Sequence, residues 1–223
     1  MAVANSRLTR EDWISFARKV LVTSGIDDVK VDVLARRMKV TRGSFYWHFA
    51  SRQDLLDALL DDWEANNRRE IEVIRSLVAA EGDALLELFR VWLGEDPSFP
   101  AFDIAIRVWA RKTPAVSKLV RKIDEAWIAL LQDQLERDGM KPPESFVRAR
   151  IMYFHQVGYF ALSIDEDIAE RATLAPYYYQ ALTGRPAPAG MVEEMLVLKP
   201  AKGRASKPAK GAGRRAAAAA AAK

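Results

Sequence analysis

The stretch Thr41–Phe49, which reads TRGSFYWHF, decides the fold of this 223-residue chain. Phe45 and Phe49 stand four residues apart, so in a helix they lie on one face. The three side chains between them must then point away from that face; they are Tyr46, Trp47 and His48. The stretch therefore predicts a short helix that is half core and half contact surface. The alternative is an aromatic helix that packs on the rest of the protein.

A second short helix precedes this one. It is expected at about Val31–Met38, where Leu34 and Ala35 share an apolar face, and the helix that follows is expected at about Arg42–Phe49. Residues 39–41 join the two. Two short helices joined by so tight a turn form a helix-turn-helix.

The second helix begins in a way that suits an anion. Thr41 is expected to cap it through its hydroxyl, and Arg42, Gly43 and Ser44 form a first turn whose free backbone N–H groups point outward. A guanidinium fits the edge of guanine, a glycine permits close approach, and a hydroxyl can bind a base or a phosphate. The residues therefore predict a helix end that enters the major groove of double-stranded DNA.

The rest of the chain up to residue 198 is also helical in its apolar spacing, with Gly and Pro between segments. Thr9 and Ser51 are expected N-caps of the first and fourth helices. Beside the two short helices, the expected helices are about Thr9–Ser24, from after Ser51 to about Leu77, Asp83–Gly94, Phe102–Lys112, Ala115–Asp138, Glu144–Ile164 and Glu166–Leu182. No strand pair, Gly-rich phosphate loop or internal repeat is visible, so the predicted class is all-α.

Charge divides the chain into three parts. Residues 1–56 carry ten Lys and Arg against six Asp and Glu, residues 57–198 carry 16 against 24, and residues 199–223 carry eight against none. Basic ends on an acidic body indicate that the ends meet a polyanion. The last part has no large apolar residue, so we expect a disordered basic Lys/Ala/Pro tail, either a non-specific DNA-binding arm or a solubilising, artificially added segment.

Several functions lose support from composition. The chain has no cysteine, which excludes disulfides, thiol catalysis and Cys-based zinc sites and fits a reducing cytoplasm. Its two histidines, His48 and His155, lie far apart, and no paired-carboxylate or Glu-x-x-His spacing occurs. We see no signal peptide and no apolar run long enough for a membrane span. We therefore expect a cytoplasmic protein that is not an enzyme and holds no cofactor or metal, with an all-α enzyme as the least supported reading.

Residues Val31–Trp63 resemble the N-terminal DNA-binding domain of TetR-family transcriptional regulators. Order, spacing and residue types agree over about fifty residues from near Thr9. The matching residues are Leu34-Ala35, Val40-Thr41, Gly43-Ser44-Phe45-Tyr46, His48-Phe49 and Ser51-Arg52-Gln53-Asp54-Leu55. The resemblance implies a helix-turn-helix domain at residues 1–56 and a helical ligand-binding and dimerisation domain at residues 57–198.

The resemblance also implies roles for the matching residues. Phosphate contacts would come from Thr41, Tyr46 and His48, base-edge contacts from Arg42, Ser44 and Trp47, and a backbone contact from Arg52. Three residues depart from the family pattern. Lys30 replaces a capping Ser or Thr and could reach a phosphate, Lys39 replaces a turn glycine at a site expected to need positive φ, and Trp47 is unusually bulky and could restrict the operator.

The family's plan implies an effector pocket in the body, where most aromatic residues are expected to be core. An apolar pocket with a few polar groups is typical of a small-molecule site, and polar residues occur on the apolar helices of the body. The candidate effector residues are Phe102, Asp103, Trp109, Trp127, His155, Gln156 and Tyr159. For His155 the alternative is a hydrogen-bonded place in a dimer interface.

The resemblance implies a homodimer joined through about residues 144–182, with recognition helices roughly 34 Å apart over a palindromic operator. The sequence thus favours a sequence-specific transcriptional regulator, a repressor that an unidentified small-molecule effector releases from DNA. The alternative is a nucleoid-type structural DNA binder driven by the basic tail.

Overall fold

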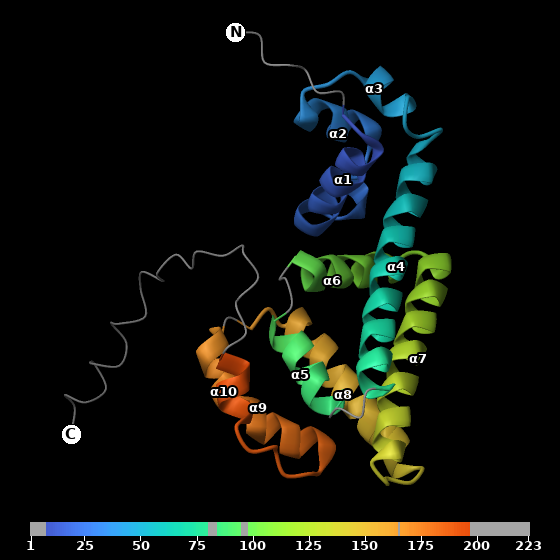
Figure 1. Ribbon diagram of the computed structural model, residues 1–223. Coiled ribbons are helices and arrows are strands. Elements are labelled where there is room, and N and C mark those ends of the chain that lie inside the picture. Colours follow the sequence, from blue (N-terminus) through green and yellow to red (C-terminus); the bar gives the residue numbers. More distant parts are fainter. Residues whose placement is uncertain (1–7, 80–83, 95–97, 165, 197–223) are drawn as a thin grey trace, which may run out of the picture.

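The computed structural model describes residues 8–79, 84–94, 98–164 and 166–196. These residues form helices and their connections, without a strand. The elements are α1 Arg10–Ser24, the short 3₁₀ helix η1 Ile26–Asp28, α2 Val31–Met38, α3 Arg42–Tyr46, α4 Arg52–Ala79, α5 Ala84–Gly94, α6 Ser98–Ala110, α7 Pro114–Arg137, α8 Glu144–Ala161, α9 Ile168–Thr183 and α10 Met191–Leu196 (Figure 1). The prediction of an all-α protein is confirmed.

A head of three helices, α1–α3, sits on one end of the molecule (Figure 1). Thr9 caps α1 as expected: its hydroxyl accepts from the Asp12 amide at 3.1 Å, and the Asp12 carboxylate accepts from the Thr9 amide at 2.8 Å. Gly25 ends the helix with a φ of 80°, a conformation that glycine adopts without steric cost. The buried face of α1 includes Trp13, which meets Phe45 of α3 edge-on with ring centroids 5.3 Å apart.

The turn between α2 and α3 contains a strained residue. Lys39 adopts the left-handed conformation with a φ of 58°, as expected for a lysine at the usual place of a glycine. The Val40 amide then closes the end of α2 by donating to the Ala35 carbonyl at 3.0 Å. At the other end of α2, Lys30 provides no side-chain cap, which confirms the loss of that cap.

Helix α3 is shorter than the sequence predicts. The expectation that it reaches Phe49 is wrong, because the helix ends at Tyr46 and the chain continues as a turn. The amides of His48 and Phe49 both donate to the Phe45 carbonyl, at 2.9 and 3.1 Å. Because one carbonyl accepts both bonds, the chain turns here and the Phe49 side chain enters the core. Its ring stacks on Phe45 with ring centroids 5.3 Å apart.

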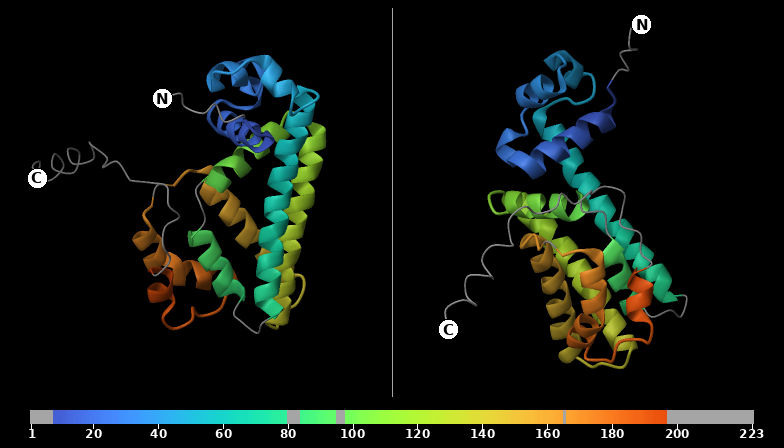
Figure 2. Two further views of the ribbon diagram at one scale, coloured as in Figure 1. Left: turned by 45° about the horizontal axis from the view of Figure 1, so that its top comes forward. Right: turned by 90° about the vertical axis from the view of Figure 1, so that its left-hand side faces the viewer.

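Helix α4 joins the head to the rest of the protein. The Ser51 hydroxyl caps it by accepting from the Asp54 amide at 3.2 Å, as predicted. Its 28 residues then continue past the predicted domain boundary at residue 56 without a break. Figure 2 shows α4 leaving the head and running down one side of the body.

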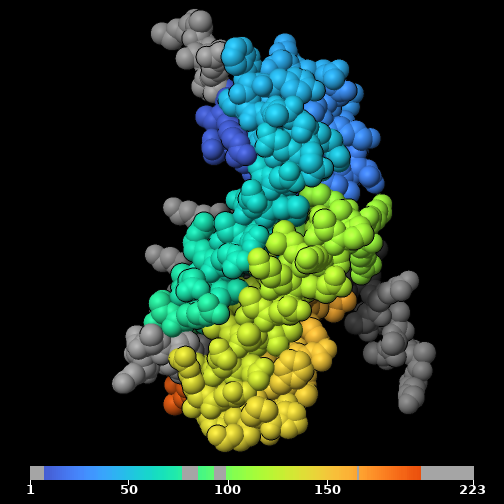
Figure 3. All heavy atoms as spheres, turned by 90° about the vertical axis from the view of Figure 1, so that its right-hand side faces the viewer, coloured from blue at the N-terminus to red at the C-terminus, as the bar shows by residue number. Residues whose placement is uncertain are grey.

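The body packs around α4. Helix α7 runs beside α4 (Figure 3). Among the described residues, the most extensive packing between two elements is that of α7 and α8. Helix α6 passes beneath α1 and contacts it, while α5 packs on α9, and α9 on α10 (Figure 1). The core therefore continues from the head into the body through α1, α4 and α6.

Some boundaries in the body differ from the expected ones. Helix α6 begins at Ser98 and not at Phe102, because Pro100 lies in its first turn, where a missing amide hydrogen costs nothing. Helix α9 begins after Asp167, whose carboxylate accepts from the Glu170 amide at 2.8 Å. Helix α10 was not predicted from the sequence. The basic tail lies outside the described residues.

Across the described ranges, no helix has both the length and the apolar character needed to cross a membrane.

Candidate nucleic-acid interface

The start of α3 is exposed and carries a cation. The Arg42 side chain is 64% exposed, and its Nε atom forms an ion pair with Asp32 of α2 at 2.7 Å. The predicted hydroxyl cap at Thr41 is wrong, because the Thr41 side chain accepts no bond from the first turn of α3. The Ser44 amide donates to the Thr41 carbonyl at 3.1 Å, while the exposed Thr41 hydroxyl is available to a partner at the surface.

The rings of α3 separate into two groups, as the sequence predicts. Phe45 and Phe49 are buried, whereas Tyr46 and Trp47 are 54% and 77% exposed. His48 is half-buried at the end of the helix. Trp47 directly follows the end of α3, and an exposed indole offers both an apolar face and an N–H donor.

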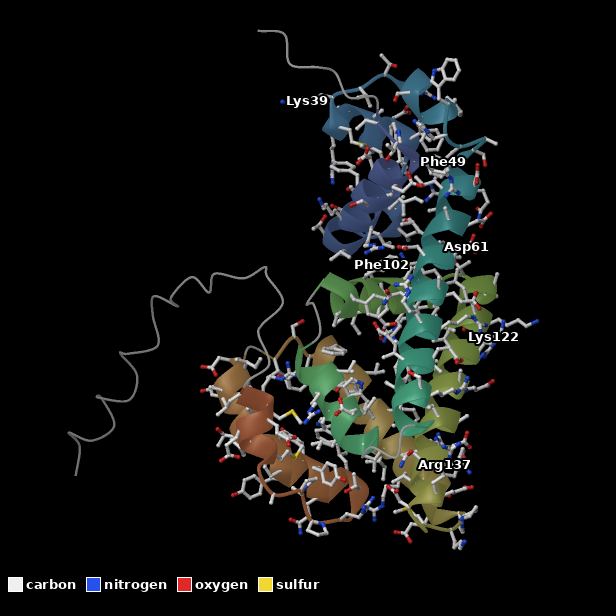
Figure 4. The ribbon with its side chains drawn as sticks, in the orientation of Figure 1. Lys39, Phe49, Asp61, Phe102, Lys122 and Arg137 are labelled. Carbon is white, nitrogen blue, oxygen red and sulfur yellow. The ribbon has the colours of Figure 1, made fainter. Side chains whose placement is uncertain are left out.

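The expected phosphate-binding cations differ in what they already contact. Lys39 points outward from the turn before α3 (Figure 4), and Lys30 is exposed at the start of α2. Arg52 instead ties α4 to the head, donating from Nε to the Val29 carbonyl at 2.5 Å and from Nη2 to the Ile26 carbonyl at 3.1 Å. A DNA contact by Arg52 stays a prediction, and the arrangement adds a structural role that the sequence did not indicate.

The head meets the body at α6. The Arg18 guanidinium of α1 lies 4.7 Å from the ring centroid of Phe102 on α6 and forms an ion pair with Asp62 of α4. Figure 4 shows Phe102 where α6 passes beneath α1. One residue further along α6, Asp103 accepts from the Trp63 indole N–H of α4 at 2.9 Å. Helix α6 thus contacts both the head and the interior of the body.

A polar network fills the space between α6, α7 and α8. Arg107 donates to Asp103 at 2.7 Å, to Asp124 at 2.9 Å and to the Tyr153 hydroxyl at 2.8 Å, and that hydroxyl donates to Asp124 at 2.7 Å. Burial alone would lower the pKa of Arg107, but the neighbouring Asp103 and Asp124 raise it, so it stays charged. Burial raises the pKa of Tyr153, which therefore keeps its proton.

Two adjoining cavities, both partly open to solvent, are formed by described residues of the body. The first, here named the α6 cavity, has a volume of about 460 Å³. Its lining residues are Asn67, Glu70, Trp92, Phe99, Pro100, Asp103, Arg107, Trp127, Tyr153, Gln156, Val157 and Phe160.

The second, the α9 cavity, has a volume of about 430 Å³. It is lined by Phe89, Trp92, His155, Gln156, Tyr159, Glu166, Arg171, Ala175, Tyr178 and Leu182. Because Trp92 and Gln156 line both, the two cavities share a wall. Both cavities are partly open to solvent, and each volume includes that open space.

Five of the seven expected effector residues reach these cavities. Asp103 and Trp127 line the α6 cavity, His155 and Tyr159 line the α9 cavity, and Gln156 lines both. Phe102 and Trp109 line neither cavity. Phe102 is fully buried beneath Arg18, and Trp109 belongs to the core.

Sequence reasoning missed Glu70 and Asn67 of α4. Both stand on the apolar stripe of that helix, which includes Trp63, Ile71 and Ile74. Polar residues at core positions of an amphipathic helix were the available signal. Within the described residues, no three acidic or histidine side chains gather in a way that could hold a metal ion.

Helices α8 and α9 expose an apolar surface. Phe146, Val147, Ile151 and Phe154 of α8 are 43–52% exposed, and the Arg150 guanidinium lies over Phe146 and Phe154, 5.5 and 5.1 Å from their ring centroids. On α9 the exposed apolar residues are Leu174, Tyr177 and Tyr178. A patch of this kind on adjacent helices is typical of a protein–protein interface.

Known proteins resemble the head in sequence and most of the chain in fold. Residues 14–59 match the model of the family described as bacterial regulatory proteins, tetR family. The HTH-type transcriptional regulator TtgW of Pseudomonas putida is 40% identical over 57 residues, which are 26% of this chain and 42% of TtgW. The match thus spans less than half of that relative.

Two solved structures share the fold. AmtR of Mycobacterium smegmatis superposes with a TM-score of 0.57 at 16% identity, over 90% of this chain and all of that one (100%). The multidrug binding protein EbrR, complexed with imidazole, superposes with a TM-score of 0.54 at 22% identity, over 81% of this chain and 96% of EbrR. The helix-turn-helix head, over residues 14–59, thus matches the TetR family of bacterial regulatory proteins, and the all-helical body shares the fold of these two solved structures.

Proposed function

We propose that the protein is a homodimeric repressor that binds a palindromic operator and is released from it by a small organic effector. The observation that carries the DNA-binding part is the exposed surface of α3, with Arg42 at its start and Trp47 directly after its end, on a segment anchored by the buried Phe45 and Phe49. Such a helix presents a rigid set of donors to the major groove.

The exposed face of α8 and α9 supports a dimer. Two copies of this face would bury the apolar side chains around Ile151 and Tyr177 in a bundle of four helices. A two-fold axis through that bundle presents two copies of α3 to one duplex. Two half-sites one helical turn apart, roughly 34 Å, would then match the two heads.

The position of α6 supports control by an effector. This helix lines the α6 cavity with Asp103 and Arg107 and contacts the head through Phe102. A ligand that binds better to one position of α6 therefore also favours one position of the head. Coupling of this kind typically changes DNA affinity by about 1–3 kcal/mol.

The basic tail supports a second candidate function, a nucleoid-type structural DNA binder. Its eight Lys and Arg without an acidic residue would bind any duplex through phosphates. This reading predicts weak sequence preference and loss of affinity when residues 199–223 are removed.

One experiment separates the two functions. A randomised duplex pool is selected on the full-length protein and on a variant that ends at Leu198, and the bound DNA is sequenced. Repression by the head predicts the same palindromic motif from both proteins. The absence of a motif, with binding lost on truncation, would establish the structural binder instead.

Arg42→Ala tests base reading on the selected motif. It should cost roughly 1–3 kcal/mol and relax preference at one base pair, because a bidentate contact to guanine is lost. Arg137→Ala is the matched control, since Arg137 is exposed at the end of α7 far from α3 (Figure 4). Equal losses on the motif and on random DNA would contradict base reading.

A further inference from the structure

Among the described residues that line the α6 cavity there is one cation, Arg107, and each of its nitrogen atoms already donates a hydrogen bond. All three nitrogen atoms of Arg107 donate hydrogen bonds, to Asp103, Asp124 and Tyr153. Asp103 is occupied as well, with one oxygen accepting from Trp63 and the other from Arg107. An anionic ligand would therefore have to break a buried ion pair before it could use the guanidinium.

The remaining polar groups of α4 in this cavity are used for packing or are left open. Asn67 accepts from the Trp127 indole at 2.9 Å and donates to the Trp63 carbonyl at 3.0 Å. Glu70 is different: its Oε1 atom accepts from Asn66 at 2.9 Å, and among the described residues nothing donates to Oε2. One carboxylate oxygen at the cavity wall is thus free for a donor.

A second open group, on α8, lines the same cavity. Gln156 is 8% exposed, lines both cavities, and its amide nitrogen is buried without a hydrogen-bond partner. An unpaired amide in such a place typically costs about 1–3 kcal/mol, which a ligand acceptor would recover. The cavity therefore offers a ligand both an acceptor, on Glu70, and an unpaired donor, on Gln156.

Charge and shape favour a cation. At the cavity wall Arg107 pairs with Asp103, and it also pairs with Asp124, which does not line the cavity; Glu70 adds a further negative charge when ionised. The walls are aromatic, with contributions from Trp92, Phe99, Trp127, Tyr153 and Phe160. Aromatic faces attract cations through their quadrupoles and also cover flat apolar rings.

We propose that the α6 cavity binds a lipophilic aromatic amine in its protonated form. Its ammonium group contacts Glu70, its ring lies between the aromatic walls, and an acceptor on the ligand takes the Gln156 amide hydrogen. This inference rests on the proposed function in treating the α6 cavity as the effector site. It adds the charge and chemical class of the effector.

The burial of Glu70 affects the charge that this carboxyl group presents to a ligand. It raises the pKa of Glu70 to about 7, an effect that the Asn66 hydrogen bond opposes and Asp103 reinforces. A bound ammonium group would stabilise the ionised carboxylate and displace its proton. Glu70 can therefore be neutral in the empty cavity and charged in the occupied one.

The test uses three ligands with the same ring and different charge: 1-naphthylmethylamine, 1-naphthalenemethanol and 1-naphthoate. Each is titrated into the full-length protein by isothermal titration calorimetry at about pH 8, where the amine is protonated and Glu70 is ionised. The amine should bind about 10- to 100-fold more tightly than the alcohol, as expected for a charge-assisted hydrogen bond in a buried site. The carboxylate should bind least.

Glu70→Gln identifies the residue that selects the cation. The variant should lose the preference for the amine while keeping its affinity for the alcohol, which also shows that the cavity is intact. Glu72→Gln is the matched control, because Glu72 is on the same helix but its side chain is 68% exposed and pairs with Arg75. The control should bind all three ligands as the natural protein does.

Other results would overturn the inference. Equal or tighter binding of the alcohol or the carboxylate would do so, as would no binding of the amine or an unchanged preference in Glu70→Gln. Release of the selected operator by the same ligands, followed by fluorescence anisotropy, tests the proposed function separately. An amine that binds through Glu70 but leaves DNA bound would support the ligand class and refute its role as effector. Release by the alcohol or the carboxylate alone would support regulation and refute the ligand class.

Discussion

The pH dependence of stability should reveal the buried carboxyl group of Glu70. Folded Glu70 keeps its proton up to about pH 7, whereas the unfolded chain loses it near its ordinary pKa of 4.5. Between these values the folded state binds more protons than the unfolded state, so stability falls as pH rises through this window. Below pH 4.5 both states are protonated and the effect vanishes.

The size of the effect follows from the same two pKa values. A rise from 4.5 to about 7 corresponds to roughly 3 kcal/mol at about 1.4 kcal/mol per pH unit. Because part of the side chain reaches solvent, we expect about 1–3 kcal/mol. Besides burial and the Asn66 hydrogen bond, two charges act on the pKa of this carboxyl group: Asp103 raises it and Arg69 lowers it. Arg107 and the phenol of Tyr153 line the same cavity, and Asp124 pairs with Arg107.

Glu70→Gln mimics the protonated carboxyl group and should remove this loss. Thermal unfolding followed by circular dichroism from about pH 5 to pH 8 should show similar Tm values at the acidic end. At about pH 8 the variant should be more stable by several degrees, given about 2–4 °C per kcal/mol for a chain of this size. Glu72→Gln, which removes the same charge from the surface, should follow the natural protein. Parallel Tm–pH curves for Glu70→Gln and the natural protein would refute the reasoning.

Three further substitutions test the packing and the surfaces. Phe45→Ala should destabilise the head by about 3–5 kcal/mol, because it leaves a cavity between Trp13 and Phe49; chemical denaturation measures this, and a loss below about 1 kcal/mol would contradict the anchoring role. Lys39→Gly should stabilise the protein by about 1 kcal/mol, since it relieves a left-handed residue; if Lys39 binds a phosphate, the salt dependence of DNA binding should also fall by about one ion. Ile151→Asp on α8 should convert a dimer to a monomer in light scattering, whereas the control Val108→Asp, at a similarly exposed site on α6, should not.

The helical pattern was predictable where local rules decide. The Thr9 cap, the Gly25 stop and the left-handed Lys39 each depend on a few neighbouring residues, and each was confirmed. The end of α3 was not, because Phe49 leaves the helix to reach a core that includes Trp13, far away in the sequence. Helix α10 has six residues, too few for a periodic pattern, and forms because Met191 and Met195 are buried.

The two candidate sites also differed in how far they could be predicted from the sequence. The exposed rings of α3 were predictable, since helical geometry separates Tyr46 and Trp47 from Phe45 within one short segment. The α6 cavity was only partly predictable, because it is formed by side chains from α4, α5, α6, α7 and α8. Which of its polar groups stay open depends on hydrogen bonds between helices, and these left Glu70 and Gln156 available.

Helix α4 is one unbroken helix, so the movement of one part of it is transmitted to the other. It is tied to the head by Arg52 at one end and lines the α6 cavity with Glu70 further along. Its 28 residues span about 42 Å at 1.5 Å per residue. A tilt of about 5° over that length displaces the far end by about 4 Å, more than the reach of a hydrogen bond. A change too small to disturb the core around the cavity is therefore large enough to lift α3 out of register with a groove.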